Sequence, residues 1–260
     1  MTRTWFSLLA VTLCLSASGC LDYAEMLTLN ADGSGKLRID FTLDMGYMEK
    51  ISKALGDEPH PDELRGPTRE EVTEGLEVEG ITIDKVDIEH KGRKSHVLVE
   101  LSFADIAALR RIEGFGDDRK IEFFDEGDGQ HARVVYSFDT TDVIPVDEVS
   151  DEEAANATDP TERKILEITR EARDALRFRG RVVMPGPVVK SNGMPDRTDP
   201  RASVWTIDKQ TSPEKHAQLG RGKIYMMLLV DKSAVSFAEL KPLPDEDPQP
   251  AKTPAPGDSH

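Results

Sequence analysis

The sequence predicts an α+β fold, in which a mainly antiparallel β-sheet is built from hairpins and carries helices packed on one face. Apolar and polar residues alternate in three pairs of segments, and a glycine-containing turn joins each pair. Short segments that begin with helix-capping residues separate these pairs. A longer segment, residues 160–176, has a single apolar stripe, which is typical of a helix that lies on a sheet.

The first hairpin is predicted over residues 23–43. Its turn is Asp32-Gly33-Ser34-Gly35, where glycine adopts positive φ at little cost. The Asp-Gly pair could also belong to a calcium loop. An EF-hand loop needs further carboxylates at set positions, however, and the residues after Gly35 do not supply them. Asp32, Gly33 and Gly35 are therefore predicted to be turn residues.

The remaining helices and strands are predicted from helix-capping residues and from the spacing of apolar residues. Helices are predicted over 45–56, after the capping box Thr68–Glu71, after Asp105, and over 160–176 with Asp159 as N-cap. Hairpins are predicted over 81–103 and 121–138, and strands over 177–184, 203–207 and 224–230. Pro185-Gly186 suits a type II turn, and Trp205 is expected to anchor its strand.

The N-terminus has the pattern of an export signal. Arg3 is the only charge before Asp22, and Phe6 to Leu15 is an apolar run of ten residues. Such a run matches a secretory signal and is too short to span a bilayer, which needs about 20 apolar helical residues. The small residues 16–19 then lead directly to Cys20.

This junction resembles the bacterial lipobox. The resemblance implies cleavage between Gly19 and Cys20 and lipidation of Cys20. Two alternatives remain open: an ordinary signal peptide with an incidental cysteine, and a buried N-terminal helix. Because Cys14 lies inside the apolar run and would be removed, the body is predicted to contain neither a disulfide nor a cysteine-based metal site.

Three regions are therefore expected. Residues 1–19 form the signal peptide, and residues 20–240 form an envelope domain that could be subdivided near 140–160. Residues 241–260 form a Pro-rich tail that is predicted to be disordered. The formal net charge of −16 disfavours binding to nucleic acid, which needs clustered Lys and Arg.

Two further blocks of the sequence carry a family resemblance. They are the turn at Asp32-Gly33-Ser34-Gly35 and the later block that contains Pro185, Gly186, Asn192 and Trp205. Together they look like the LppM-type family of bacterial lipoproteins. The resemblance implies an α+β envelope domain without established catalysis, sometimes linked to lipid or glycolipid contact. In that family these residues serve turns and packing.

The expected function is that of a lipid-anchored cell-envelope lipoprotein, facing the periplasm or the cell surface, with a binding or scaffolding role. The expected partners are the membrane, through the N-terminal lipid, and a lipid or an envelope protein. No catalytic residue, metal site or cofactor is predicted, since none of the six histidines stands at metal-ligand spacing. The alternative is a carboxylate- or metal-dependent envelope hydrolase, in which histidines and carboxylates must converge.

Overall fold

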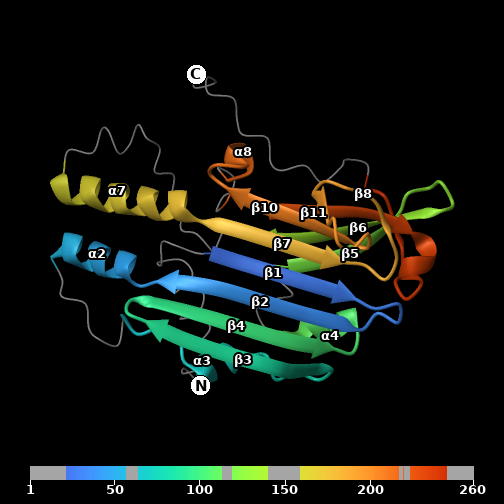
Figure 1. The fold of residues 1–260 in the computed structure, drawn as a ribbon, viewed down its shortest axis with the longest axis horizontal. Coiled ribbons are helices and arrows are strands. Elements are labelled where there is room, and N and C mark those ends of the chain that lie inside the picture. The colour runs from blue at the N-terminus through green and yellow to red at the C-terminus, as the bar shows by residue number, and fades with distance from the viewer. Residues whose placement is uncertain are drawn as a thin grey trace.

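The chain folds into two β-sheets that pack face to face (Figure 1). This computed structural model describes residues 22–56, 64–112, 119–139, 159–216, 219 and 223–244. The strand order is β3-β4-β2-β1-β7-β10-β9 in the seven-stranded sheet and β12-β5-β6-β11-β8 in the five-stranded sheet. The α+β class and the mostly antiparallel arrangement are confirmed. The division of the strands between two sheets was not predicted.

The strands of the seven-stranded sheet are β1 Asp22–Leu29, β2 Gly35–Asp44, β3 Ile81–Lys91, β4 Lys94–Phe103, β7 Arg177–Val183, β9 Met194–Pro195 and β10 Ala202–Asp208. Those of the five-stranded sheet are β5 Arg119–Asp125, β6 His131–Asp139, β8 Val188–Ser191, β11 Lys223–Asp231 and β12 Lys241–Pro242. The helices are α2 Gly46–Leu55, α3 Arg69–Thr73, α4 Ile106–Arg111, α7 Pro160–Ala175, α8 Pro213–His216 and the 3-10 helix η2 Lys232–Val235.

All three predicted hairpins are present, as the antiparallel pairs β1–β2, β3–β4 and β5–β6. The predicted helix caps are present too. Thr68 forms the capping box with Glu71, and the Asp105 and Asp159 carboxylates accept backbone N–H groups at the starts of α4 and α7. The sequence signals for these hairpins and helix caps are therefore confirmed.

The β1–β7 pair is parallel, in contrast to the hairpins. Asp22 lies opposite Arg177, and the register continues to Thr28 opposite Val183. A parallel pair cannot be closed by a tight turn, and here the chain between the two strands includes α2 to α7. β1, the first strand among the described residues, thereby becomes the central strand of its sheet.

The core lies between the two sheets. Side chains of β1 alternate between partly exposed and buried, so that Tyr23, Leu27 and Leu29 point inward. From the other sheet, Tyr136 and Met226 belong to the same buried cluster. One contiguous hydrophobic core thus joins the two sheets.

The two longest helices extend beyond the strand ends. Figure 1 shows α2 and α7 side by side at one end of the molecule, and α2 is the principal partner of α7. The expectation that helix 160–176 lies on a sheet is therefore corrected: its apolar stripe, with Ile168 buried, serves helix–helix packing. Within the described residues, no helix has the length and apolar character needed to cross a membrane.

The boundary of the folded part also differs from the prediction. Lys241 and Pro242, assigned by the sequence to the tail, form β12 and pair in parallel with Phe124 and Asp125 of β5. Just before them, the Phe237 ring packs edge-on against Phe123 at 5.7 Å between ring centroids. The chain thus joins the edge of the five-stranded sheet before it leaves the described residues.

Candidate functional site

The predicted turn residues of the first hairpin have structural roles. Asp32 accepts hydrogen bonds from the Ser34 N–H at 3.0 Å and the Ser34 hydroxyl at 2.6 Å, which lower the pKa of its carboxyl. Gly33 has φ +85°, which glycine adopts without strain. A Cβ on Gly35 would lie 2.0 Å from the Thr28 carbonyl oxygen, so close packing requires this glycine.

The predicted type II turn at Pro185-Gly186 is wrong. Such a turn needs positive φ at the glycine, and Gly186 is not among the glycines with positive φ. A Cβ on Gly186 would instead lie 2.9 Å from the Ala234 Cβ of η2. A glycine is needed here because the backbone packs closely against that 3-10 helix, and not because the residue has positive φ.

Asn192 and Trp205 come together at the corner where the chain passes from one sheet to the other. The Trp205 indole N–H donates to Asn192 Oδ1 over 2.7 Å, and the Met227 N–H donates to the same oxygen over 2.9 Å. The Asn192 amide nitrogen donates to the Tyr225 carbonyl over 2.8 Å. A Cβ on Gly193 would lie 2.6 Å from the Trp205 ring. One amide side chain therefore links β10 to β11.

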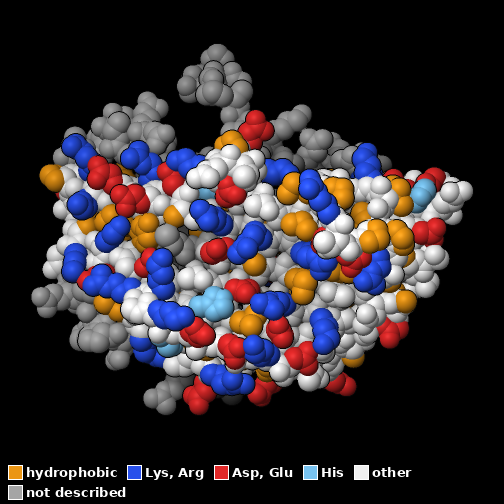
Figure 2. Space-filling view, in the orientation of Figure 1, with side chains coloured by type: hydrophobic (Ala, Val, Ile, Leu, Met, Phe, Trp, Pro, Cys, Tyr) orange, Lys and Arg blue, Asp and Glu red, His pale blue; other side chains and the backbone are white. Residues whose placement is uncertain are grey.

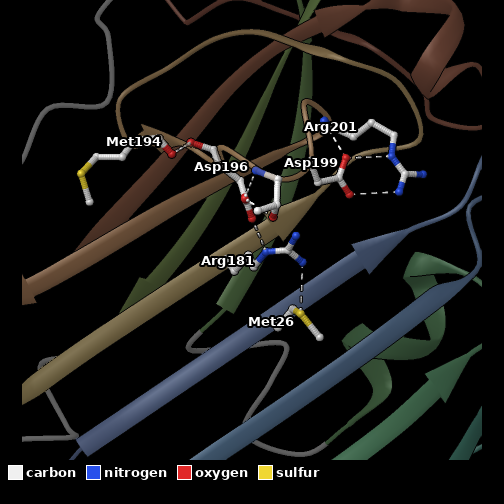
Figure 3. A network of polar contacts seen from close by, with 8 residues as sticks. Met26, Arg181, Met194, Asp196, Asp199 and Arg201 are labelled. Carbon is white, nitrogen blue, oxygen red and sulfur yellow. Dashed lines mark hydrogen bonds and ion pairs between the residues drawn. The ribbon is translucent and has the colours of Figure 1, made fainter.

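The loop after β9 is held over the outer face of the seven-stranded sheet (Figure 3). Arg181 Nε on β7 donates to Asp196 Oδ2 over 2.9 Å, and Arg181 Nη1 lies 3.3 Å from Met26 Sδ. Hydrogen bonds from Thr198, followed by those from Arg181, hold the pKa of Asp196 well below its usual range. These groups are occupied in fixing the loop.

A second pair in the same loop is bidentate. Arg201 donates from Nε to Asp199 Oδ1 at 3.1 Å and from Nη2 to Oδ2 at 3.0 Å. Figure 2 shows that cationic and anionic side chains are interspersed over this face of the molecule. Because opposite charges are paired and interspersed, the surface around this loop does not form a patch of a single charge that would attract an oppositely charged ligand.

A pocket of about 300 Å³ lies beside the Asn192 corner, on the five-stranded sheet. It is lined by Glu126, Arg133, Lys190, Ser191, Asn192, Met227, Leu228 and Leu229. Arg133 Nε donates to Glu126 Oε1 over 2.5 Å, and Lys190 is exposed. The pocket thus combines an apolar wall with an exposed cation, which suits a ligand that has both an apolar and an anionic part.

The sequence pattern singles out Asn192 but none of the other residues that line this pocket. Lys190 belongs to a four-residue strand, and Met227 and Leu229 belong to a run of apolar residues without alternation. A continuous apolar run does not tell which side chains face the core and which face outward. Only the pairing of β11 with β6 and β8 distinguishes them.

A buried polar cluster connects the two sheets elsewhere. Glu25 on β1 is 4% exposed and accepts hydrogen bonds from the hydroxyls of Tyr23 and Tyr136 and from Arg119 Nε at 3.2 Å. The Arg119 guanidinium lies 4.4 Å from the centroid of the Phe138 ring. Burial is the main cause of the raised pKa of Tyr23. Because the carboxylate is enclosed, this cluster holds the sheets together rather than meeting a substrate.

The four described histidines lie apart and have different partners. His90 contacts the Ser95 hydroxyl at 2.9 Å, His96 contacts Asp40 at 2.8 Å, and His131 contacts Asp128 at 2.5 Å. His216 is 4% exposed at the end of α8. No group of three or more His, Cys, Asp and Glu suited to a metal ion occurs within the described parts of the chain. The convergence that the hydrolase alternative requires is thus not seen among these residues.

The predicted cleavage and lipidation residues, Gly19 and Cys20, lie outside the described residues. The first described residue, Asp22, already belongs to β1. If Cys20 carries a lipid, a single residue separates it from the folded domain.

Comparison with protein-family models finds no match, and no curated protein matches the chain. Among solved structures, the chain is similar to the folded domain of LppM from Mycobacterium tuberculosis, determined by NMR. The match has 13% sequence identity and a TM-score of 0.40, and covers 82% of this chain and 91% of that chain. At this similarity it assigns neither family membership nor activity.

Proposed function

We propose that the chain is a lipid-anchored bacterial cell-envelope lipoprotein with a non-catalytic binding role. Its N-terminal residues have the pattern of a signal peptide followed by a lipidation cysteine. Lipidation of Cys20 would hold the domain at the membrane surface, because β1 begins at Asp22. Two or more acyl chains on one residue would give stable attachment, which a single chain does not.

The pocket beside Asn192 is the observation that supports a binding role. Its volume of about 300 Å³ lies at the lower end of the range for ligand pockets. It accommodates part of a lipid, such as a headgroup with the start of an acyl chain, rather than a whole one. Lys190 would attract the anionic headgroup, and Met227 and Leu229 would contact the apolar part. The other candidate partner is an envelope protein that inserts one acidic side chain beside Lys190 and one apolar side chain against Met227 and Leu229.

The anchor is tested by substitution of Cys20 in the full chain. Cys20→Ala should abolish incorporation of a labelled fatty acid and should leave uncleaved precursor or release the protein into the soluble fraction. Cys14→Ala is the matched control, because Cys14 lies within the segment that would be removed. Processing and membrane association of the Cys20→Ala protein at the level of the control would contradict the proposal.

The binding role is tested by native mass spectrometry of the protein purified from its membrane. A bound lipid should be detected, and Leu229→Asp should remove it. Met194→Asp is the control, because Met194 is 60% exposed and does not line the pocket. Circular dichroism must show that both variants fold. If no lipid is bound and one defined envelope protein co-purifies instead, the lipid proposal is contradicted and the partner is a protein.

A further inference from the structure

Four exposed cations gather at one end of the molecule. Lys91, Arg93 and Lys94 lie at the turn between β3 and β4, and Lys53 lies in the last turn of α2. We call these four residues the basic patch. Their side chains are between 59% and 84% exposed. Although both signs of charge occur over the face shown in Figure 2, cationic side chains predominate at its left, over α2 and the adjoining ends of β2 and β4.

Two of the carboxylates that partner these cations are enclosed. Glu49 pairs with Lys53 over 2.6 Å and also with Arg93, and only 8% of its side chain is exposed. Asp44 lies 3.7 Å from Lys94 Nζ, and 19% of its side chain is exposed. These two negative charges therefore lie beneath the patch, whereas the positive charges lie at its surface.

The basic patch differs in this respect from an ion pair further along β3. Lys85 and Asp87 are paired over 2.6 Å, and their side chains are 48% and 52% exposed, so both charges meet the solvent alike. At the patch the exposed carboxylate is Glu89, which pairs with Lys91 over 2.9 Å and is 61% exposed. Four exposed cations thus accompany one exposed carboxylate, and such an excess of positive charge attracts anions.

The basic patch lies at the end of the sheet where β1 begins. Asp22 is opposite Thr42 of β2, and Thr42 is opposite His96 of β4. Two residues further towards this end, Asp44 is opposite Lys94. Two strand spacings of about 4.8 Å and two residues of about 3.4 Å place the Lys94 Cα about 12 Å from the Asp22 Cα.

A lipid on Cys20 would bring this end of the molecule to the bilayer. Two residues of extended chain span about 7 Å, so Asp22 would lie within that distance of the lipidated residue. The field of an anionic membrane surface extends over about one Debye length, which is about 8 Å at physiological ionic strength. The formal net charge of −16 means that such a surface repels the chain as a whole. An approach with the basic patch foremost is therefore the favoured orientation.

We propose that the basic patch binds the anionic phospholipid headgroups of the membrane that carries the anchor. The ammonium groups of the lysines and the guanidinium group of Arg93 contact the phosphates, so that α2 and the β3–β4 turn lie against the bilayer. The patch is a second membrane contact beside the acyl chains, and it fixes the orientation of the domain. The proposal rests on the proposed lipid anchor, because the anchor supplies the proximity that a weak contact between charges needs.

Lysine footprinting on vesicles tests this contact. In the chain from residue 20, Cys20 is the only cysteine, and its thiol can be coupled to a maleimide phospholipid in the vesicle. One set of vesicles contains phosphatidylglycerol mixed with phosphatidylcholine, and the other contains phosphatidylcholine alone. Acetylation of Lys53, Lys91 and Lys94 by a water-soluble reagent should be several-fold slower on the vesicles with phosphatidylglycerol. High salt should remove the difference.

Lys36 is the internal control for the footprint. Its side chain is 72% exposed, and it is opposite Thr28, which lies six residues or about 20 Å along β1 from Asp22. The acetylation rate of Lys36 should be the same on both sets of vesicles. Equal rates for the patch lysines on the two sets, or a slowing at Lys36 as large as at the patch, would overturn the proposal.

Charge reversal provides a second measurement. Lys91→Glu together with Lys94→Glu should abolish the difference in rate at Lys53. Lys36→Glu together with Lys241→Glu changes the net charge equally and should preserve it. Circular dichroism must show that both variants fold, and an unchanged difference at Lys53 in the folded patch variant would contradict the proposal. Because the anchor is attached chemically, these outcomes are independent of whether Cys20 is lipidated in the cell.

Discussion

The indole N–H of Trp205 donates to the side-chain oxygen of Asn192 over 2.7 Å, and this contact ties β10 of one sheet to the corner that leads into the other. Trp205 is 3% exposed, so its N–H depends on this partner rather than on bulk water. The same oxygen also receives the Met227 N–H of β11. Asn192 is thus a junction between the sheets and a wall of the pocket.

Asn192→Ala should lower the free energy of unfolding by about 1–3 kcal/mol, because it leaves the buried Trp205 N–H without an acceptor. Urea denaturation monitored by tryptophan fluorescence measures the change. Trp205→Phe removes the donor and gives the comparison needed for a double-mutant cycle, with denaturation followed by circular dichroism. Strictly additive losses in the double variant would show that the two residues are not coupled.

Glu25→Ala should be far more destabilising than the loss of a surface carboxylate. It removes the carboxylate that lies 3.2 Å from Arg119 Nε in the buried cluster, and breaking a buried pair in this way costs about 3–5 kcal/mol. The control is Glu100→Ala, whose partner Arg38 is 43% exposed, so that the loss should stay below about 1 kcal/mol. Similar losses in the two variants, measured by chemical denaturation, would show that the Glu25 cluster does not hold the sheets together.

His216 should make the protein less stable in mildly acidic solution. Burial is the main cause of its lowered pKa, so the folded state favours the neutral ring. Below the unfolded pKa of about 6.5 the unfolded chain binds more protons, and the free energy of unfolding therefore falls as pH decreases. Thermal denaturation from pH 7.5 to 5 measures the slope. His216→Gln should flatten it, and an unchanged slope would exclude His216 as its origin.

Gly35→Ala should destabilise the first hairpin severely. The added Cβ would lie 2.0 Å from the Thr28 carbonyl oxygen and 2.4 Å from the Phe103 ring, so the backbone itself must move. Gly92→Ala is the matched control, because a Cβ there meets open space and suffers only from φ +65°. The control should cost about 1–2 kcal/mol, and Gly35→Ala should cost more than that. Comparable midpoints in urea would contradict this account of Gly35.

The turn glycines Gly33 and Gly186 show which backbone conformations can be predicted from neighbouring residues alone. Gly33 was predicted from an Asp-Gly turn and has the expected positive φ. Gly186 was predicted from a Pro-Gly pair on the same reasoning, yet its role is contact with Ala234, a residue 48 positions later. Nothing within the turn itself distinguishes the two cases, because the second depends on which segment packs against it.

In the candidate site too, contacts between distant residues cannot be predicted from the local sequence. Asn192 and Trp205 stand out in the sequence, but their hydrogen bond does not follow from their spacing. Glu25 carries a weak signal: it occupies an inward position among the alternating apolar residues of β1. Its partners Tyr136 and Arg119 belong to the other sheet, and no local pattern points to them.

The sequence by itself determined the three hairpins and the main helices with their caps, since these depend on interactions between residues a few positions apart. It also carries the export pattern that ends at Cys20. Only the tertiary structure decided that β1 pairs in parallel with β7, that the strands form two sheets, and that Asn192 accepts the indole N–H of Trp205. These relations join distant segments, and their stability comes from surfaces that exist only once both segments have folded.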